Sequence, residues 1–189
     1  MPDSNLGQGK AVLVGMPQAE GHSSLPFALQ EVNAVGTSCT SMQLQVAKPR
    51  SLWGEVLSAL ECSIFQPAGH GQTNNSDPLQ SAMILTDGCL AVAEIFKLNL
   101  RSRGPFLAYL SACGTGRMRH DHLIDEGVHL IAACQLASFQ HVIGALWEVA
   151  DETCVEIAVK IYEWVKNHGM AYDSVSEALH QACRSSRSA

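Results

Sequence analysis

The sequence FLAYLSACGTG, residues 106–116, consists of an apolar run followed by a tight glycine turn. The run has the length and composition of a buried strand, and Cys113 stands where it ends. A second apolar run, CSIFQPAGHG at residues 62–71, ends in the same way at His70. In an open α/β sheet, groups just past the carboxyl ends of parallel strands converge on one crevice. The two runs therefore predict a thiol and an imidazole at one sheet edge.

Strand and helix patterns alternate along the rest of the chain. The apolar segments Ala11–Gly15, Met42–Val46 and His141–Trp147 predict further strands. Helical patterns begin near Ser24, Trp53, Val92, Asp125, Thr153 and Ser174. Alternating strands and helices indicate a parallel sheet covered on both faces. We count five main strands.

Three local patterns make finer predictions. Leu25, Leu29 and Val32 should form the inner face of the first helix. The pair Asp87–Gly88 favours a type I′ turn between two short strands and so predicts a small hairpin. The spacing Ser174-x-x-Glu177 is that of a capping box, which predicts the start of the last helix.

The length and charge of the chain limit the class of protein. A chain of 189 residues fits one domain, and we expect it to span residues 11–183, with a tail or linker at 1–10 and a flexible tail at 184–189. The net charge of -6 argues against a nucleic-acid-binding surface. No apolar run approaches the roughly 20 residues that cross a bilayer, and the first residues do not resemble a signal peptide. These features predict a cytoplasmic protein with neither a nucleic-acid nor a membrane partner.

The seven cysteines do not form a disulfide framework. Their number is odd, their spacing is wide, and no C-x-x-C occurs, which is typical of reduced thiols in an intracellular protein. Six of them are interpreted as small core hydrophobes. Cys113 differs through its position at a strand end.

A thiol next to an imidazole supplies a cysteine nucleophile and its base. Glycines after Cys113 and on both sides of His70 leave room for a substrate, and let backbone N–H groups turn toward an oxyanion. The alternatives are a buried core cysteine and a loop histidine without a role.

Other motifs are incomplete. His120-Asp121-His122 lacks a third ligand at convincing spacing, so no metal site is predicted. Gly114-x-Gly116 lacks the third glycine of a dinucleotide fingerprint, and neither a Walker lysine nor G-x-S-x-G occurs. We therefore expect no cofactor.

Several segments together resemble the CHAT domain, a caspase-like family related to separase, gingipains and metacaspases. They are Leu13–Pro17, Ala68–Gly71, Asp87–Leu90, Leu110–Cys113, Asp125–Leu130 and Val142–Asp151. They follow the family order with similar spacing over nearly the whole chain. The resemblance implies a caspase-like three-layer α-β-α sandwich with a mostly parallel central sheet and a small hairpin.

The resemblance also implies a cysteine endopeptidase with a His/Cys dyad. By matched motif, His70 is the catalytic histidine, Cys113 the nucleophile, and the backbone N–H groups of Gly71 and Cys113 the oxyanion donors. Asp151 is the candidate for reading a basic P1 side chain. The other acidic candidates for that role are Glu148, Asp77 and Asp125, and Asp151 has the alternative role of capping a helix near Thr153.

The implied partners are a protein or peptide substrate and regulatory repeat or nucleotide-binding domains, in cis or in trans. Some residues depart from the family pattern: Gln66-Pro67 before the histidine and Met118-Arg119 after the cysteine. Many members also continue into a last strand, whose absence is expected to leave a sheet edge exposed. These departures support an alternative function, a catalytically inactive pseudoprotease that serves as an interaction module.

Overall fold

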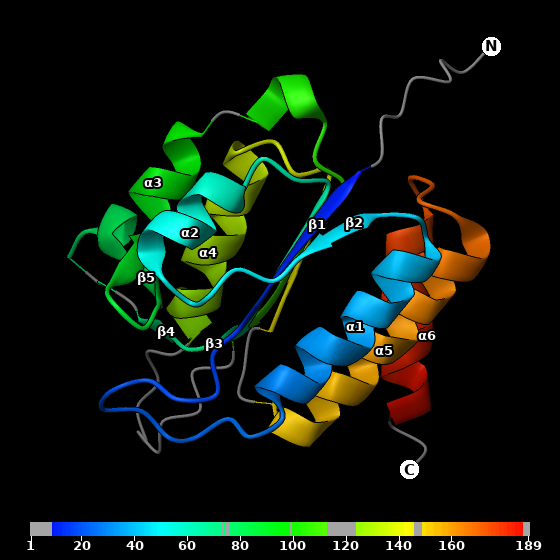
Figure 1. Cartoon of the computed structure of the whole chain (residues 1–189), viewed down its shortest axis with the longest axis horizontal. Coiled ribbons are helices and arrows are strands. Elements are labelled where there is room, and N and C mark those ends of the chain that lie inside the picture. Colours follow the sequence, from blue (N-terminus) through cyan, green and yellow to red (C-terminus); the bar gives the residue numbers. More distant parts are fainter. Residues whose placement is uncertain are drawn as a thin grey trace.

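A five-stranded parallel sheet runs through the middle of the molecule (Figure 1). The computed structural model describes residues 9–72, 74, 76–98, 100–112, 124–145 and 149–186. The strand order is β2-β1-β3-β7-β8, and every neighbouring pair is parallel. The bounds are Lys10–Gly15 for β1, Gln45–Ala47 for β2, Ile64–Gly69 for β3, Leu107–Ala112 for β7 and His141–Gly144 for β8. The predicted parallel sheet is confirmed.

The pleat of β1 sends side chains into two separate cores. Val12 and Val14 enter the core on one side of the sheet, whereas Ala11 and Leu13 enter the core on the other. All four are at most 1% exposed. A parallel strand buried on both faces needs such a continuous apolar run, and each large apolar side chain that it buries stabilises the fold by about 1.5–3 kcal/mol.

Helices cover both faces and complete the expected three-layer sandwich (Figure 1). One layer consists of α1 (Ala28–Ser41), α5 (Asp151–His168) and α6 (Ser174–Ser186). The other consists of α2 (Trp53–Ala59), α3 (Val92–Lys97) and α4 (Ile124–Leu136). Helix α5 buries Ala158, Ile161, Tyr162 and Val165 in the core on its side of the sheet.

A small antiparallel sheet contains the predicted hairpin. It consists of β4 (Gly71–Gln72), β5 (Ala82–Ile84) and β6 (Cys89–Ala91), with short 3-10 helices at Pro78–Gln80 (η1) and Leu100–Arg103 (η2). The predicted type I′ turn is wrong, because Gly88 does not have the positive φ that this turn needs. Ile84 pairs with Cys89 across a four-residue loop. Asp87 instead accepts a hydrogen bond from the backbone N of Trp53, 2.7 Å away, at the start of α2.

Two helix details also differ from expectation. Leu29 is 50% exposed because α1 begins at Ala28 and turns Ala28, Glu31 and Val32 inward, which rotates Leu29 outward. The capping box at Ser174 does not form. The helix α6 begins at Ser174 itself, whose hydroxyl donates to the carbonyl oxygen of Ala171 at 2.7 Å.

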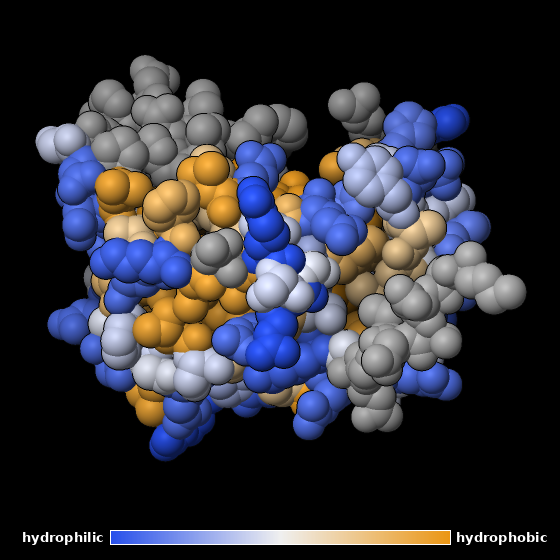
Figure 2. Space-filling view, turned by 90° about the horizontal axis from the view of Figure 1, so that it is seen from above, coloured by the Kyte–Doolittle hydropathy of each residue, from blue (hydrophilic) through white to orange (hydrophobic). Residues whose placement is uncertain are grey.

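The surface carries some exposed apolar groups. Seen from above, apolar residues gather over the layer that contains α2, α3 and α4 (Figure 2), and Phe96 of α3 and Leu136 of α4 are exposed. Cys183 is exposed and Cys89 half-buried, so the expectation that six cysteines are core residues is wrong for these two. Within the described ranges, no helix is long and apolar enough to cross a membrane.

Candidate functional site

His70 lies directly after β3, where this strand leaves the central sheet and β4 of the small sheet begins. Gly69 allows this geometry, because a Cβ there would lie 2.7 Å from the Cε of Met16 and 2.9 Å from its Cβ. The close approach is fixed by a 2.8 Å hydrogen bond from the Met16 N–H to the carbonyl oxygen of Ala68. The glycine before His70 is thus required by packing against the end of β1.

The ring of His70 is covered by the loop between β1 and α1. Its side chain is fully buried, and its Nε2 lies 2.8 Å from the carbonyl oxygen of Ser23. The His22 ring lies against it, tilted by 31°, with centroids 4.8 Å apart. A carbonyl oxygen only accepts, so Nε2 must carry the hydrogen. In the neutral ring, Nδ1 then has the free lone pair, and this atom has no hydrogen-bond partner among the described residues.

Burial also sets the charge of the ring. It lowers the pKa of His70 below its ordinary value of 6.5, outweighing the hydrogen bond to Ser23 and the carboxylate of Asp151, which raise this pKa. The imidazole is therefore neutral at pH 7. A neutral ring with a free, buried Nδ1 is suited to accept a proton.

Cys113 lies outside the described residues, but the strand that leads to it is well defined. β7 ends at Ala112, one residue before Cys113. In the parallel ladder between β3 and β7, Ala112 is the partner of Gly69, the residue directly before His70. The structure thus brings together the two positions that immediately precede the predicted dyad. Gly71, a predicted oxyanion donor, follows His70 and pairs with Met83 of β5.

Asp151 is the first residue of α5, not its cap. The N-cap of α5 is Ala150, so the alternative role of Asp151, capping a helix near Thr153, is wrong. Its Oδ2 accepts a hydrogen bond from the backbone N of Phe27 at 2.9 Å, and Phe27 is the N-cap of α1. Asp151 therefore stabilises the start of another helix, where a negative charge is favoured.

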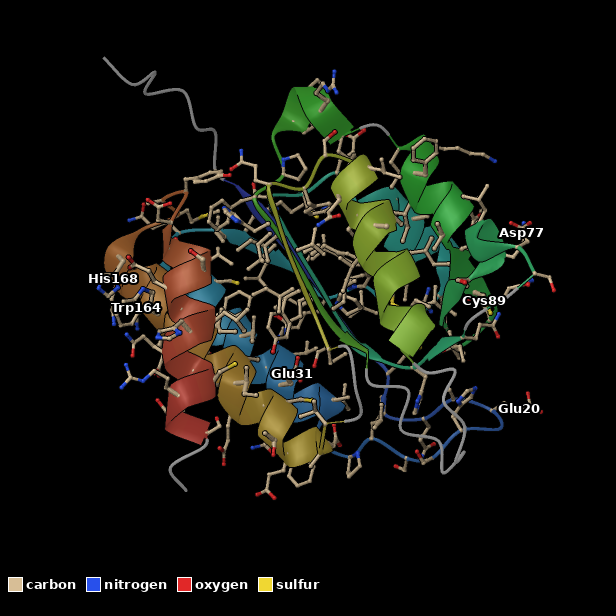
Figure 3. All side chains as sticks on the ribbon, turned by 180° about the vertical axis from the view of Figure 1, so that it is seen from behind. Glu20, Glu31, Asp77, Cys89, Trp164 and His168 are labelled. Atoms are coloured by element: carbon tan, nitrogen blue, oxygen red, sulfur yellow. The ribbon has the colours of Figure 1, made fainter. Side chains whose placement is uncertain are left out.

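The other acidic candidates are less informative. Glu148, like His120-Asp121-His122, lies outside the described residues, and of Asp125 only the helical backbone is described. Asp77 accepts a hydrogen bond from the backbone N of Leu79 at 3.1 Å and lies at the outer side of the small sheet (Figure 3). Across the described ranges, no three His, Cys, Asp or Glu side chains are arranged to hold a metal ion.

Two cavities flank the carboxyl ends of the strands. A polar cleft of about 760 Å³ lies between the β1–α1 loop and the hairpin, lined by Glu20, His22, Ser24, Thr86 and Asp87 among others. An apolar cavity of about 240 Å³ lies beside the ends of β7 and β8, lined by Tyr109, Ser111, Gly144, Val149, Cys154 and Cys183 among others.

One buried polar cluster was missed in the sequence. Glu31 of α1 accepts hydrogen bonds from Gln66 Nε2 of β3 and from Ser111 Oγ of β7, the latter at 2.8 Å. A signal was present, because Glu31 falls in the i, i+3, i+4, i+7 series formed with Ala28, Val32 and Val35. A charged residue inside an apolar stripe indicates a buried polar contact.

The comparisons with known proteins agree with this architecture. The family model of the CHAT domain matches residues 2–189, and no curated protein matches the chain. The parallel sheet, the helical layers on both faces and the small antiparallel sheet are those of a caspase-like fold. The chain therefore belongs to the CHAT domain family, a caspase-like family related to cysteine peptidases.

Proposed function

We propose that this domain is a cysteine endopeptidase with Cys113 as nucleophile and His70 as base. The observation that carries the proposal is the ladder pairing of Gly69 with Ala112. His70 directly follows Gly69, and Cys113 directly follows Ala112. Each member of the proposed dyad is therefore one Cα–Cα step, about 3.8 Å, beyond a residue of this pair. The tautomer of His70 also supports the proposal. The hydrogen on Nε2 is bonded to the carbonyl oxygen of Ser23, so Nδ1 keeps the lone pair that can accept a proton.

In the proposed reaction, Nδ1 of His70 takes the proton from the Cys113 thiol. The thiolate attacks the scissile carbonyl carbon, and the carbonyl oxygen becomes an oxyanion held by the backbone N–H groups of Gly71 and Cys113. Collapse of this intermediate breaks the C–N bond, and the imidazolium returns its proton to the leaving amine. Water then hydrolyses the thioester and regenerates the thiol. Ser23 keeps the ring orientation constant through these steps.

The substrate of this reaction is a protein or peptide. Asp151 remains our candidate for selecting a basic P1 residue, since its carboxylate acts electrostatically on both His70 and Glu31. We further propose that the domain works in the cytoplasm under the control of repeat or nucleotide-binding domains, in cis or in trans.

A pseudoprotease is the second candidate, and the complete burial of His70 favours it. A cysteine-selective electrophile such as iodoacetamide, followed by peptide mass mapping, distinguishes the two. An enzyme should label Cys113 much faster than the exposed Cys183, since the base activates only the former thiol. Cleavage of a peptide library should also disappear in Cys113→Ala. Equal labelling of the two thiols, with no cleavage by the wild type, supports the interaction module instead.

A further inference from the structure

Glu31 is a carboxyl group held in the core, and no described residue forms an ion pair with it. It is 1% exposed, and the ion pairs of the described residues, Arg50 with Glu55 and Arg103 with Glu61, involve other groups. Burial raises the pKa of Glu31 to about 7, although the hydrogen bonds from Ser111 and Gln66 lower it. An apolar side chain would fill this place at a lower cost in desolvation. The carboxyl group therefore needs an explanation other than packing.

Both hydrogen-bond donors to Glu31 lie on strands that lead to the proposed dyad. Gln66 stands four residues before His70 in β3, and Ser111 stands two residues before Cys113 in β7. Glu31 reaches them from α1, and lies near the ends of the central strands (Figure 3). Its two carboxylate oxygens accept one hydrogen bond each. The side chain thus joins the middle of β3, at Gln66, to the penultimate residue of β7, Ser111.

The surroundings give this link two states. The titratable group that acts on Glu31 is the carboxylate of Asp151 at the start of α5, which raises its pKa. Tyr162, also on α5, does not act on Glu31; the charge of Glu31 instead raises the pKa of the buried Tyr162 hydroxyl. In the ionised state, Glu31 accepts from both donors. In the protonated state one oxygen must donate, either to the Ser111 hydroxyl oxygen, whose own proton then turns away, or to Gln66 Oε1 after the amide turns, since this atom is buried and has no partner among the described residues. Protonation therefore rearranges the link, because one of the two hydrogen bonds that Glu31 accepts is replaced by one that it donates.

We propose that Glu31 is a positioning residue of the peptidase site. Its ionised carboxylate ties β3 to β7 through Gln66 and Ser111, and so holds His70 and Cys113 at the separation that proton transfer needs. This inference rests on the proposed function and deepens it. A displacement of about 1 Å between reacting groups costs up to about a hundredfold in rate, so the link affects turnover more than substrate binding.

The test compares the wild type with Glu31→Gln and Ser111→Ala. Tyr162→Phe is the matched control, since it removes a buried polar group of the same core that has no hydrogen-bond partner among the described residues. For each variant, kcat and KM are measured on a fluorogenic peptide from about pH 5.5 to about pH 8.5. We expect Glu31→Gln to lower kcat about tenfold or more with KM nearly unchanged, and to remove a titration near pH 7. Ser111→Ala should cause a smaller loss in kcat, and Tyr162→Phe should match the wild type.

A second readout does not depend on proteolysis. The rate of Cys113 alkylation by iodoacetamide is compared with that of Cys183, an internal reference on α6. The positioning role of Glu31 is overturned if Glu31→Gln keeps the wild-type kcat and pH profile. In that case the proposed function still holds, provided that Cys113→Ala abolishes cleavage. If the wild type does not cleave at all, the proposed function fails. If, in addition, Glu31→Gln leaves the ratio of the Cys113 alkylation rate to the Cys183 alkylation rate unchanged, the positioning role of Glu31 is overturned as well. If circular dichroism shows that Glu31→Gln is unfolded, Ser111→Ala decides by the same criteria.

Discussion

The carboxylate of Asp151 lies 2.9 Å from the backbone N of Phe27, 124 positions earlier in the chain. The contact joins the first residue of α5 to the N-cap of α1. A carboxylate in this place neutralises part of the positive end of the α1 dipole. Asp151 therefore has a structural partner, and its proposed role at P1 must be separated from this contact.

Asp151→Asn separates the two roles. The amide oxygen of Asn can still accept the hydrogen bond from Phe27, so we expect stability to change by less than about 1 kcal/mol. If the charge selects basic P1 residues, cleavage after Arg and Lys should fall at least about tenfold. A peptide-library profile measures this, with thermal melting as the control. Unchanged cleavage after basic residues would remove Asp151 from the substrate site.

Besides the titration of Glu31 near pH 7, the activity of the domain should have a second acid limb below pH 6.5, which the charge of His70 sets. Burial lowers the pKa of His70 below this ordinary value, so the neutral base is present at higher pH and is lost as the pH falls through the lowered pKa. The profile of kcat/KM against pH measures the midpoint. His22→Ala should move the midpoint upward, because His22 shields the ring and its charge lowers the pKa of His70. A midpoint that stays in place would show that His22 does not control this base.

Glu31→Gln should gain stability relative to the wild type as the pH rises. The folded-state pKa of Glu31 is raised from 4.5 to about 7, so between these values the folded state holds more protons than the unfolded state. Wild-type stability from this group therefore declines as the pH rises from about 4.5 to about 7, in total by roughly 3 kcal/mol. The Gln variant lacks this decline. Denaturant unfolding at pH 5 and pH 8 measures the free energy of unfolding of both proteins. If the difference in this free energy between the variant and the wild type is the same at both pH values, the raised pKa of Glu31 is contradicted.

Gly69→Ala should weaken both the fold and the site. The new Cβ would lie 2.9 Å from the Cβ of Met16, which is not a flexible chain end, so we expect a loss of about 1–3 kcal/mol. Gly88→Ala is the control, because a Cβ there meets nothing within 4 Å and no positive φ is involved. Its stability should stay within about 0.5 kcal/mol of the wild type. Equal melting curves for the two variants would refute the packing explanation.

The sequence predicted those parts of the fold that follow from periodicity. The alternation of strands and helices, and the apolar runs before His70 and Cys113, were enough for the parallel sheet and for one common edge. Contacts without periodicity were not predictable. The apolar stripe of α1 indicates that Glu31 makes a buried polar contact, but its partners Gln66 and Ser111 lie 35 and 80 positions away, and no pattern in the sequence pairs them with it. The β1–α1 loop likewise carries no pattern that shows Ser23 meeting His70.

Helix α1 and the loop that leads into it carry three of the contacts described above. The carbonyl oxygen of Ser23 accepts a hydrogen bond from the imidazole of His70. The backbone N of Phe27 donates to the carboxylate of Asp151, and Glu31 links β3 to β7 through Gln66 and Ser111. The hydrogen bonds at Ser23, Phe27 and Ser111 are 2.8 or 2.9 Å long. A slide of α1 along its axis by one residue, about 1.5 Å, is roughly half the length of such a bond, so it would change the geometry of the contacts at Phe27 and Glu31. The segment from Ser23 to Glu31 thus links the base His70, the strands β3 and β7, and helix α5. A displacement of α1 from its outer side, where Leu29 is exposed, would affect all three.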